Sequence, residues 1–349
     1  GYRAQVQYMV WFFLILRLLE DRKDAATLYG VFAAVVFVLS LHGIYQYAVG
    51  VEIPASWVSQ TETGVRTRVF SLTGSPNIFG SLIVMAAPML AALMYYCKTA
   101  KWKIASLLAV GAACLCILFT FSRGAWVGLI VAVVLFALYV DKRLLLLMTG
   151  AMAGILAAVP SITARLTYLF TTDYAEASAI GGRALRWQVG HDLLMENSPW
   201  LGFGLGRFGG AVAMNNQLLD ETETFRYFYM DNYYLKTLVE MGYLGLIFFL
   251  LVLAVFAVSG FRAVHRSGAE YETAESKDAL CRNIGNPKLL TAGIFSGLSG
   301  VLVHCYFENI FEEPYMMSYF WGLAALMIYL GLFAKKSGKT ISDDRRASQ

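Results

Sequence analysis

Residues 181–210 read GGRALRWQVGHDLLMENSPWLGFGLGRFGG, and residues 231–240 read DNYYLKTLVE. They belong to the longest polar interval in a chain that otherwise consists of apolar runs. The interval carries four arginines, and then an aspartate where the apolar sequence resumes: Arg183, Arg186, Arg207, Arg226 and Asp231. We interpret these groups, together with Arg123, as an anion site at one membrane surface.

Composition indicates the class of protein. Hydrophobic residues make up 58% of the 349 residues and charged residues 15%, whereas soluble domains have about half and about a quarter. We therefore expect an all-α, polytopic membrane protein, with one membrane domain over residues 1–349. The first apolar run, 6–19, is shorter than the helix of about 20 residues that crosses a bilayer, so we expect N-terminal spans to be missing. The five cysteines show no CxxC spacing, which predicts neither a disulfide framework nor a metal cluster.

Apolar runs and positive charges predict the topology. Nine runs are expected to span the membrane: 6–19, 26–49, 76–96, 104–121, 125–140, 144–160, 233–259, 289–307 and 315–334. If the turn at 17–24 is cytoplasmic, 18 of the 28 Lys and Arg residues fall on that side and 10 fall elsewhere. The positive-inside rule therefore predicts that orientation. It makes residues 161–230 an extracytoplasmic loop within the membrane domain and residues 335–349 a disordered cytoplasmic tail.

Two shorter outward features precede that loop. The connection 50–75 carries Arg66 and Arg68 and ends before Pro76, a residue suited to the first position of a helix. The sequence Ser-Arg-Gly at 122–124 then separates two apolar runs. Its arginine, Arg123, is either a snorkelling side chain or a functional group, and the depletion of arginine from outward loops favours function.

The loop 161–230 is long enough to indicate a function. Its segment 184–194 has a helical apolar pattern that predicts a helix lying on the membrane surface. Arg183 and Arg186 are three residues apart and share a helix face, so they are expected to grip either one polyanion or lipid headgroups. Arg207 and Arg226 are expected to be solvated.

The acidic residues have alternative roles. Asp231 is either the N-cap of the following helix or a general base at the lip of a cavity, and the two roles are compatible. Glu240 lies four residues after Lys236, which predicts a neutralising ion pair within a helix. His304 and Glu308 have the same spacing, which is typical of a His–carboxylate pair facing the cavity; the alternative is a histidine hydrogen-bonded between packed helices.

Two other patterns give little evidence for a function. The histidines do not form a spacing such as HExxH, so metal ligation is poorly supported. The sequence GLGRFG at 204–209 matches GxGxxG, but no predicted strand precedes it. We interpret it as a flexible turn.

At these positions the sequence resembles the O-antigen ligase and O-antigen polymerase (Wzy-type) superfamily of bacterial envelope glycan assembly. The resemblance covers most of the chain and rests on five motifs in order: TRVFSLTGSPNIFG at 67–80, FSRGAWVG at 121–128, GGRALRW through SPWLGFGLGRFG at 181–209, DNYYLKTLVEMGYLGL at 231–246, and VHCYFENIFEEPYMMSYFWG at 303–322.

This resemblance implies an all-helical membrane fold of the GT-C type with about a dozen spans, in agreement with a missing N-terminal portion. It also implies that Arg123 and Arg183 bind the diphosphate of an undecaprenyl-linked glycan. Family ligases have a histidine as the proposed base where this chain has Asp231. An aspartate there looks more like polymerases, and it leaves His304 as a rival base.

The sequence therefore predicts a metal-independent, inverting glycosyltransferase at the outer face of the bacterial cytoplasmic membrane, and a polymerase rather than a lipid A–core ligase. Its expected partners are a polyprenyl-diphosphate-linked glycan donor, a glycan or lipid acceptor and the bilayer, with no cofactor and no nucleic acid. Asp231 would accept the proton, while Arg123 and Arg183, assisted by Arg186 and Arg68, would hold the diphosphate. The alternatives are a transporter of a small anion such as bicarbonate and a non-catalytic scaffold in an envelope-assembly complex.

Overall fold

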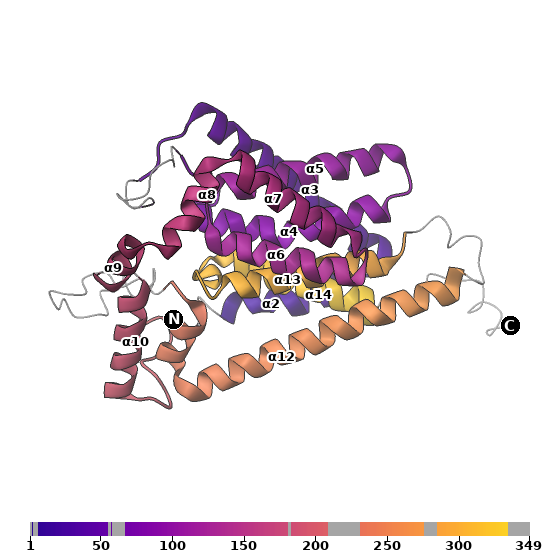
Figure 1. Ribbon diagram of the computed structural model, residues 1–349. Helices are drawn as coiled ribbons and strands as arrows, with labels where there is room; N and C mark the ends of the chain where they lie inside the picture. Colours follow the sequence, from indigo (N-terminus) through magenta and orange to yellow (C-terminus); the bar gives the residue numbers. More distant parts are fainter. Residues whose placement is uncertain are drawn as a thin grey trace.

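The computed structural model describes residues 2, 6–54, 57, 67–180, 183–208, 231–275 and 285–333, and all their regular structure is helical (Figure 1). The elements, in chain order, are η1 (Gln7–Met9), α2 (Val10–Leu18), α3 (Arg22–Val49), α4 (Pro76–Tyr96), α5 (Ala100–Phe119), α6 (Arg123–Tyr139), α7 (Arg143–Ala158), α8 (Pro160–Thr167), η3 (Tyr168–Phe170), α9 (Thr172–Ile180), α10 (Arg183–Asn197), α12 (Tyr233–Glu275), α13 (Pro287–His304), η5 (Ile310–Glu312), α14 (Pro314–Ile328) and the π-helical turn η6 (Tyr329–Phe333).

The chain is an all-α polytopic membrane protein, as predicted. Each of the nine expected apolar runs contains a helix. Within the described residues, five helices are long and apolar enough to cross a membrane: Arg22–Val49, Pro76–Tyr96, Ala100–Phe119, Tyr233–Ala269 and Pro314–Phe333. α7 and the segment Pro160–Phe170 qualify only as a pair.

Two of the expected spans are not straight. The run 144–160 ends at Ala158, and Pro160 opens α8 at an angle of 96° to α7. Proline lacks a backbone N–H and has a fixed φ, so it suits the start of a new helix better than the interior of an old one. The second run, within α12, is broken at Gly242, whose φ is 67° and ψ is −174°. Both departures lie close to the candidate site.

The core forms where α4, α6 and α13 approach each other through glycines. A β-carbon at Gly300 would lie 2.6 Å from the carbonyl oxygen of Gly128, and one at Gly128 would lie 2.7 Å from the carbonyl oxygen of Gly300. Gly297 makes a similarly close approach to the backbone of Met85 on α4. Without side chains at these positions, the three backbones pack closely and α13 becomes the central helix.

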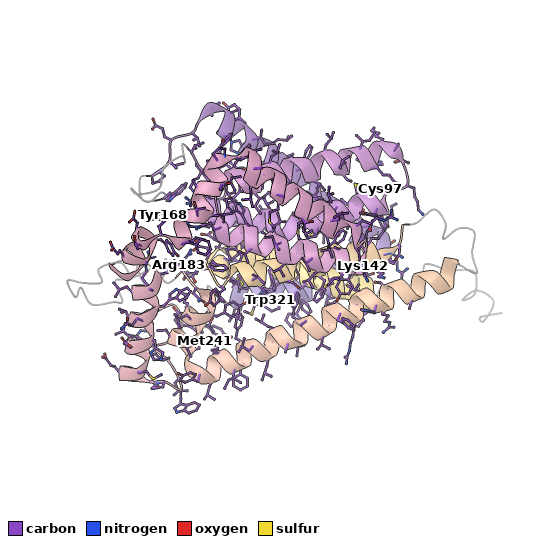
Figure 2. The ribbon with its side chains drawn as sticks, viewed as in Figure 1. Cys97, Lys142, Tyr168, Arg183, Met241 and Trp321 are labelled. Carbon is purple, nitrogen blue, oxygen red and sulfur yellow. The ribbon has the colours of Figure 1, made fainter. Side chains whose placement is uncertain are left out.

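The polar segments gather at two ends of the bundle. In Figure 2, Cys97 and Lys142 lie at one end, while Tyr168 and Arg183 lie toward the other. α10 crosses this second end, and α8 and α9 lie beside it (Figure 1). α10 is the helix that the pattern at 184–194 predicted; its place on a membrane surface stays a prediction. The assignment of this end to the outer face stays a prediction.

Candidate active site

The site begins with one face of α10. Three of its side chains converge on the carboxylate of Asp231, which is 7% exposed. The Nε of Arg183 donates to Oδ2 at 2.6 Å, and the Nη1 of Arg186 lies 3.9 Å from the same oxygen. The Nε1 of Trp187 donates to Oδ1 at 3.3 Å. Residues three and four apart share a face of a helix, and both arginines approach the same oxygen, so the shared face that the sequence predicted is observed; the anion that they were expected to bind stays a prediction.

Asp231 is held by α10 and does not cap its own helix. The side chain of Asn232 accepts hydrogen bonds from the backbone N–H groups of Tyr234 and Leu235, at 3.0 and 3.1 Å. Asn232 is therefore the cap of α12, and the alternative that made Asp231 the cap was wrong. The reason is register: the cap lies one residue later, and Asp231 is left for contacts with other segments.

Arg183 also contacts the turn that follows α13. The Nη2 of Arg183 donates to the carbonyl oxygen of Phe307 at 3.0 Å. From the other side, a β-carbon at Gly124 would lie 2.8 Å from the Cβ of Phe307 and 2.8 Å from the Cδ2 of His304. Arg183 and the residue that follows Arg123 thus contact the same turn.

Arg123 is the first residue of α6 and reaches toward α8 and α9. Its Nη1 donates to the carbonyl oxygen of Arg165 at 3.2 Å, and its guanidinium lies 5.6 Å from the centre of the Tyr174 ring. A cation over an aromatic face is attracted by the ring quadrupole. Arg123 is therefore a half-buried cation at the same end of the bundle as Arg183.

Two buried arginines hold the turn that presents Arg123. The Nε of Arg68 donates to the carbonyl oxygen of Thr120 at 2.9 Å, and the Nε of Arg165 donates to that of Phe121 at 2.7 Å. Phe121 has a φ of 50°, a left-handed conformation that is costly for a bulky residue. We infer that the two guanidinium groups stabilise this turn. Sequence reasoning missed Arg165, although an arginine in the loop that was expected to face outward was a usable signal.

Arg68 was expected to assist with substrate. Its guanidinium instead contacts protein groups: besides Thr120, it donates to the carbonyl oxygen of Trp57 at 2.8 Å and to the Oδ1 of Asn77 at 3.0 Å. The residue is only 6% exposed. Arg68 is therefore a buried residue that supports the turn before Arg123.

The expected pair between His304 and Glu308 is not what the structure shows. The Nδ1 of His304 bonds to the Oγ of Ser81 at 2.6 Å, and Glu308 accepts a short hydrogen bond from Asn77. α13 ends at His304, so the helical spacing on which the prediction depended does not extend to Glu308. Both residues are buried, at 1% and 6% exposure. The alternative of a histidine bonded between packed helices is the one observed.

The predicted ion pair between Lys236 and Glu240 is confirmed, with 3.0 Å between Nζ and Oε1. The sequence did not predict its third member: the same Nζ lies 2.8 Å from Oε1 of Glu312 in η5. Burial raises the pKa of Glu312, and nearby Lys236 opposes that rise. This triad fixes α12 to the segment that follows the Phe307 turn.

The GxGxxG match is a turn, but it is held firmly. The break at Gly242 leaves the carbonyl oxygens of Val239 and Glu240 without helical partners, and the N–H groups of Phe203 and Gly204 donate to them at 2.9 and 2.8 Å. In return, the N–H of Tyr243 donates to the carbonyl oxygen of Pro199 at 2.9 Å. We call residues 198–208 the clasp. The predicted turn is confirmed, and its hydrogen bonds to the broken part of α12 were not foreseen.

Other predicted residues lie outside this cluster. Arg207 is exposed, as expected. Arg66 and Arg226 lie outside the described residues. Among the residues that the structure describes, no group of three or more His, Cys, Asp and Glu side chains could hold a metal ion.

Two arginines, Arg183 and Arg186, surround the carboxylate of Asp231. Arg123 adds a third positive charge at the same end of the bundle, where it contacts Arg165 and Tyr174. The site has the chemistry to bind an anion and to accept a proton beside it. A search of curated proteins found no match. Residues 108–250, which include all of these residues, match the family model Wzy_C, O-Antigen ligase, so this part of the chain is similar to that family.

Proposed function

We propose that this protein is a metal-independent, inverting glycosyltransferase that acts on a polyprenyl-diphosphate-linked glycan. The family supports a role in glycan assembly of the O-antigen ligase or polymerase type. The observation that carries the finer proposal is the contact of Arg183 with Asp231 at 2.6 Å. It sets the cation that we propose to bind phosphate directly beside the group that we propose to accept the proton.

In the proposed reaction, a hydroxyl oxygen of the acceptor attacks the anomeric carbon of the donor sugar. The new C–O bond forms as the bond from that carbon to the diphosphate oxygen breaks, with inversion. The hydroxyl proton passes to Asp231, and the electron pair of the broken bond leaves with the polyprenyl diphosphate. Arg123, Arg183 and Arg186 stabilise the charge that accumulates on this leaving group.

Arg183 is suited to join the two halves of this reaction. A guanidinium has five N–H donors, and the structure uses one for Asp231 and one for the carbonyl oxygen of Phe307. Three N–H donors remain for phosphate oxygens, and charge-assisted hydrogen bonds contribute about 1.5–3 kcal/mol each. The same side chain would therefore hold the base in place and bind the leaving group.

Asp231 is suited to act as the base because its two oxygens face different groups. Both arginines of α10 approach Oδ2, while Oδ1 accepts a hydrogen bond from the neutral indole of Trp187. A carboxylate oxygen has two lone pairs, so Oδ1 keeps one for a proton. His304 is the poorer candidate, because it is 1% exposed and its Nδ1 is bonded to Ser81.

We further propose that the site faces the outside of the bacterial cytoplasmic membrane and that the protein extends a glycan rather than ligating it to lipid A–core. The orientation follows from the positive-inside distribution. The preference for a polymerase follows from the aspartate at position 231, where family ligases resemble each other in having a histidine.

The test is the consumption of lipid-linked glycan, extracted from cells that lack the protein, by purified protein in nanodiscs. Arg123→Ala and Arg183→Ala should each abolish transfer. Arg207→Ala is the matched control, because this arginine is exposed and belongs to the clasp rather than to the Asp231 cluster. Unaltered transfer in both site variants would refute the proposal. Uptake of labelled bicarbonate by proteoliposomes, without glycan transfer, would favour a transporter instead.

A further inference from the structure

Tyr306 is an exposed aromatic residue in a buried segment. It is 48% exposed, and across residues 301–311, all of which the structure describes, it is the only exposed side chain. Among the described residues, its hydroxyl has no hydrogen-bond partner. Such a residue is available to a ligand.

Its position ties it to the candidate active site. The Tyr306 ring lies 5.5 Å from the Trp187 ring, centre to centre, with an angle of 78° between the planes. The two rings therefore form a corner, and Trp187 is the residue whose Nε1 donates to Oδ1 of Asp231. The next residue, Phe307, supplies the carbonyl oxygen that accepts from Arg183. Tyr306 is thus one side chain away from the carboxylate and one residue away from the arginine contact.

We propose that the corner formed by Trp187 and Tyr306 is the subsite for the acceptor sugar. This inference rests on the proposed function and names which substrate binds on which side of Asp231. An aromatic face carries partial negative charge, and it attracts the C–H groups on one face of a pyranose ring. Binding sites for small ligands combine such apolar walls with a few polar groups, and here the polar group is the carboxylate.

The two oxygens of Asp231 separate the acceptor from the donor. Arg183 and Arg186 approach Oδ2, so phosphate belongs on that side. Trp187 contacts Oδ1, which keeps a lone pair for the proton of the attacking hydroxyl. The sugar that carries this hydroxyl must lie against Oδ1, and the aromatic corner is the surface present there.

An aromatic residue near a membrane surface is also suited to anchor a protein in the lipid interface. Tyr45 provides the matched control. It is a 62% exposed tyrosine near the end of α3, and its ring stacks on His42 rather than on a residue of the site. Its replacement removes an exposed aromatic ring without touching the corner.

The experiment uses purified protein in nanodiscs, lipid-linked glycan from cells that lack the protein, and undecaprenyl diphosphate as a competitive inhibitor. Tyr306→Leu should raise the KM for glycan about tenfold, because the loss of one aromatic contact weakens binding by about a factor of ten. Its inhibition by undecaprenyl diphosphate should be unchanged. Tyr306→Phe, which keeps the ring, should stay within about twofold of the parent, and so should Tyr45→Leu.

Three results would overturn the subsite while leaving the proposed function intact. In the first, Tyr306→Leu transfers glycan as the parent does. In the second, glycan transfer falls in both Tyr306→Leu and Tyr45→Leu, which indicates that the rings anchor the protein in the lipid interface. In the third, it loses inhibition by undecaprenyl diphosphate, which places Tyr306 on the donor side. A parent protein that transfers no glycan would overturn both the function and the subsite.

Discussion

The Nε of Arg183 lies 2.6 Å from Oδ2 of Asp231, across 48 positions of sequence. The contact joins α10, which crosses the end of the bundle, to Asp231, two residues before α12 begins (Figure 1). It brings the predicted anion-binding arginine and the predicted base into one site.

Trp187 is expected to position the base. Trp187→Phe keeps an aromatic ring against Tyr306 but removes the N–H that donates to Asp231. A hydrogen bond to a charged group contributes about 1.5–3 kcal/mol, and this one is long, so kcat should fall about tenfold. Steady-state kinetics with lipid-linked glycan measures the change. An unchanged kcat would show that Oδ1 does not depend on the indole.

Lys236 is expected to stabilise the fold. Lys236→Met would leave Glu240, which is 1% exposed, and Glu312 without their shared cation. Breaking a buried ion pair costs about 3–5 kcal/mol, so the melting temperature in detergent should fall sharply. The double variant Lys236→Met/Glu240→Gln should recover part of the loss, because Glu312 retains 19% side-chain exposure. A double variant no better than the single one would contradict this account of the triad.

The clasp should depend on Gly202. Its φ is 73°, and a β-carbon there would lie 2.5 Å from the carbonyl carbon of Glu240. Gly74 has the same φ but nothing within 4 Å of the corresponding position. Gly74→Ala therefore measures the cost of the backbone conformation, about 1–2 kcal/mol, and Gly202→Ala adds a clash. Thermal unfolding should show a larger loss for Gly202→Ala; equal losses would mean that the clasp yields easily.

Glu313 should make stability depend on pH. Burial, and then the charges of Glu312 and Glu308, raise the pKa of Glu313. A carboxyl group whose pKa is raised in the folded state contributes stability at low pH that is lost as the pH rises through the folded-state pKa. The pH range over which this stability is lost begins near 4.5, the ordinary pKa of a glutamate side chain, and extends to higher pH.

Glu313→Gln should therefore be more stable than the parent at pH 7.5 and should lose less stability between pH 4.5 and 7.5. Melting temperatures at the two pH values give the comparison. Glu196→Gln, at an exposed position on α10, is the control. If both variants behave alike, the effect does not come from the environment of Glu313.

Part of this architecture follows from local sequence, and part of it does not. The apolar runs predicted the helices, and the pattern at 184–194 predicted α10, because the spacing of apolar residues along the sequence shows which face of a helix is buried. The pairing of Arg183 with Arg186, and that of Lys236 with Glu240, followed from helical spacing.

The remaining contacts depend on how distant segments pack. The break at Gly242 goes together with the backbone hydrogen bonds that the clasp makes to α12. Neither the sequence around Gly242 nor the sequence of the clasp predicts the break alone. Asn77 and Arg165 receive their partners from segments 231 and 44 residues away. The same holds for His304, whose partner Ser81 lies 223 residues away. A spacing of four predicted a bond to Glu308 that the end of α13 prevents.

Binding of undecaprenyl diphosphate to the purified protein tests the central claim most directly, with the parent, Arg183→Ala and Asp231→Asn compared by titration in nanodiscs. Arg183→Ala should bind more weakly. Asp231→Asn should bind more tightly, since it removes a negative charge next to the arginines, and yet it should transfer no glycan. Equal binding by the parent and Arg183→Ala, or normal transfer by Asp231→Asn, would contradict the account.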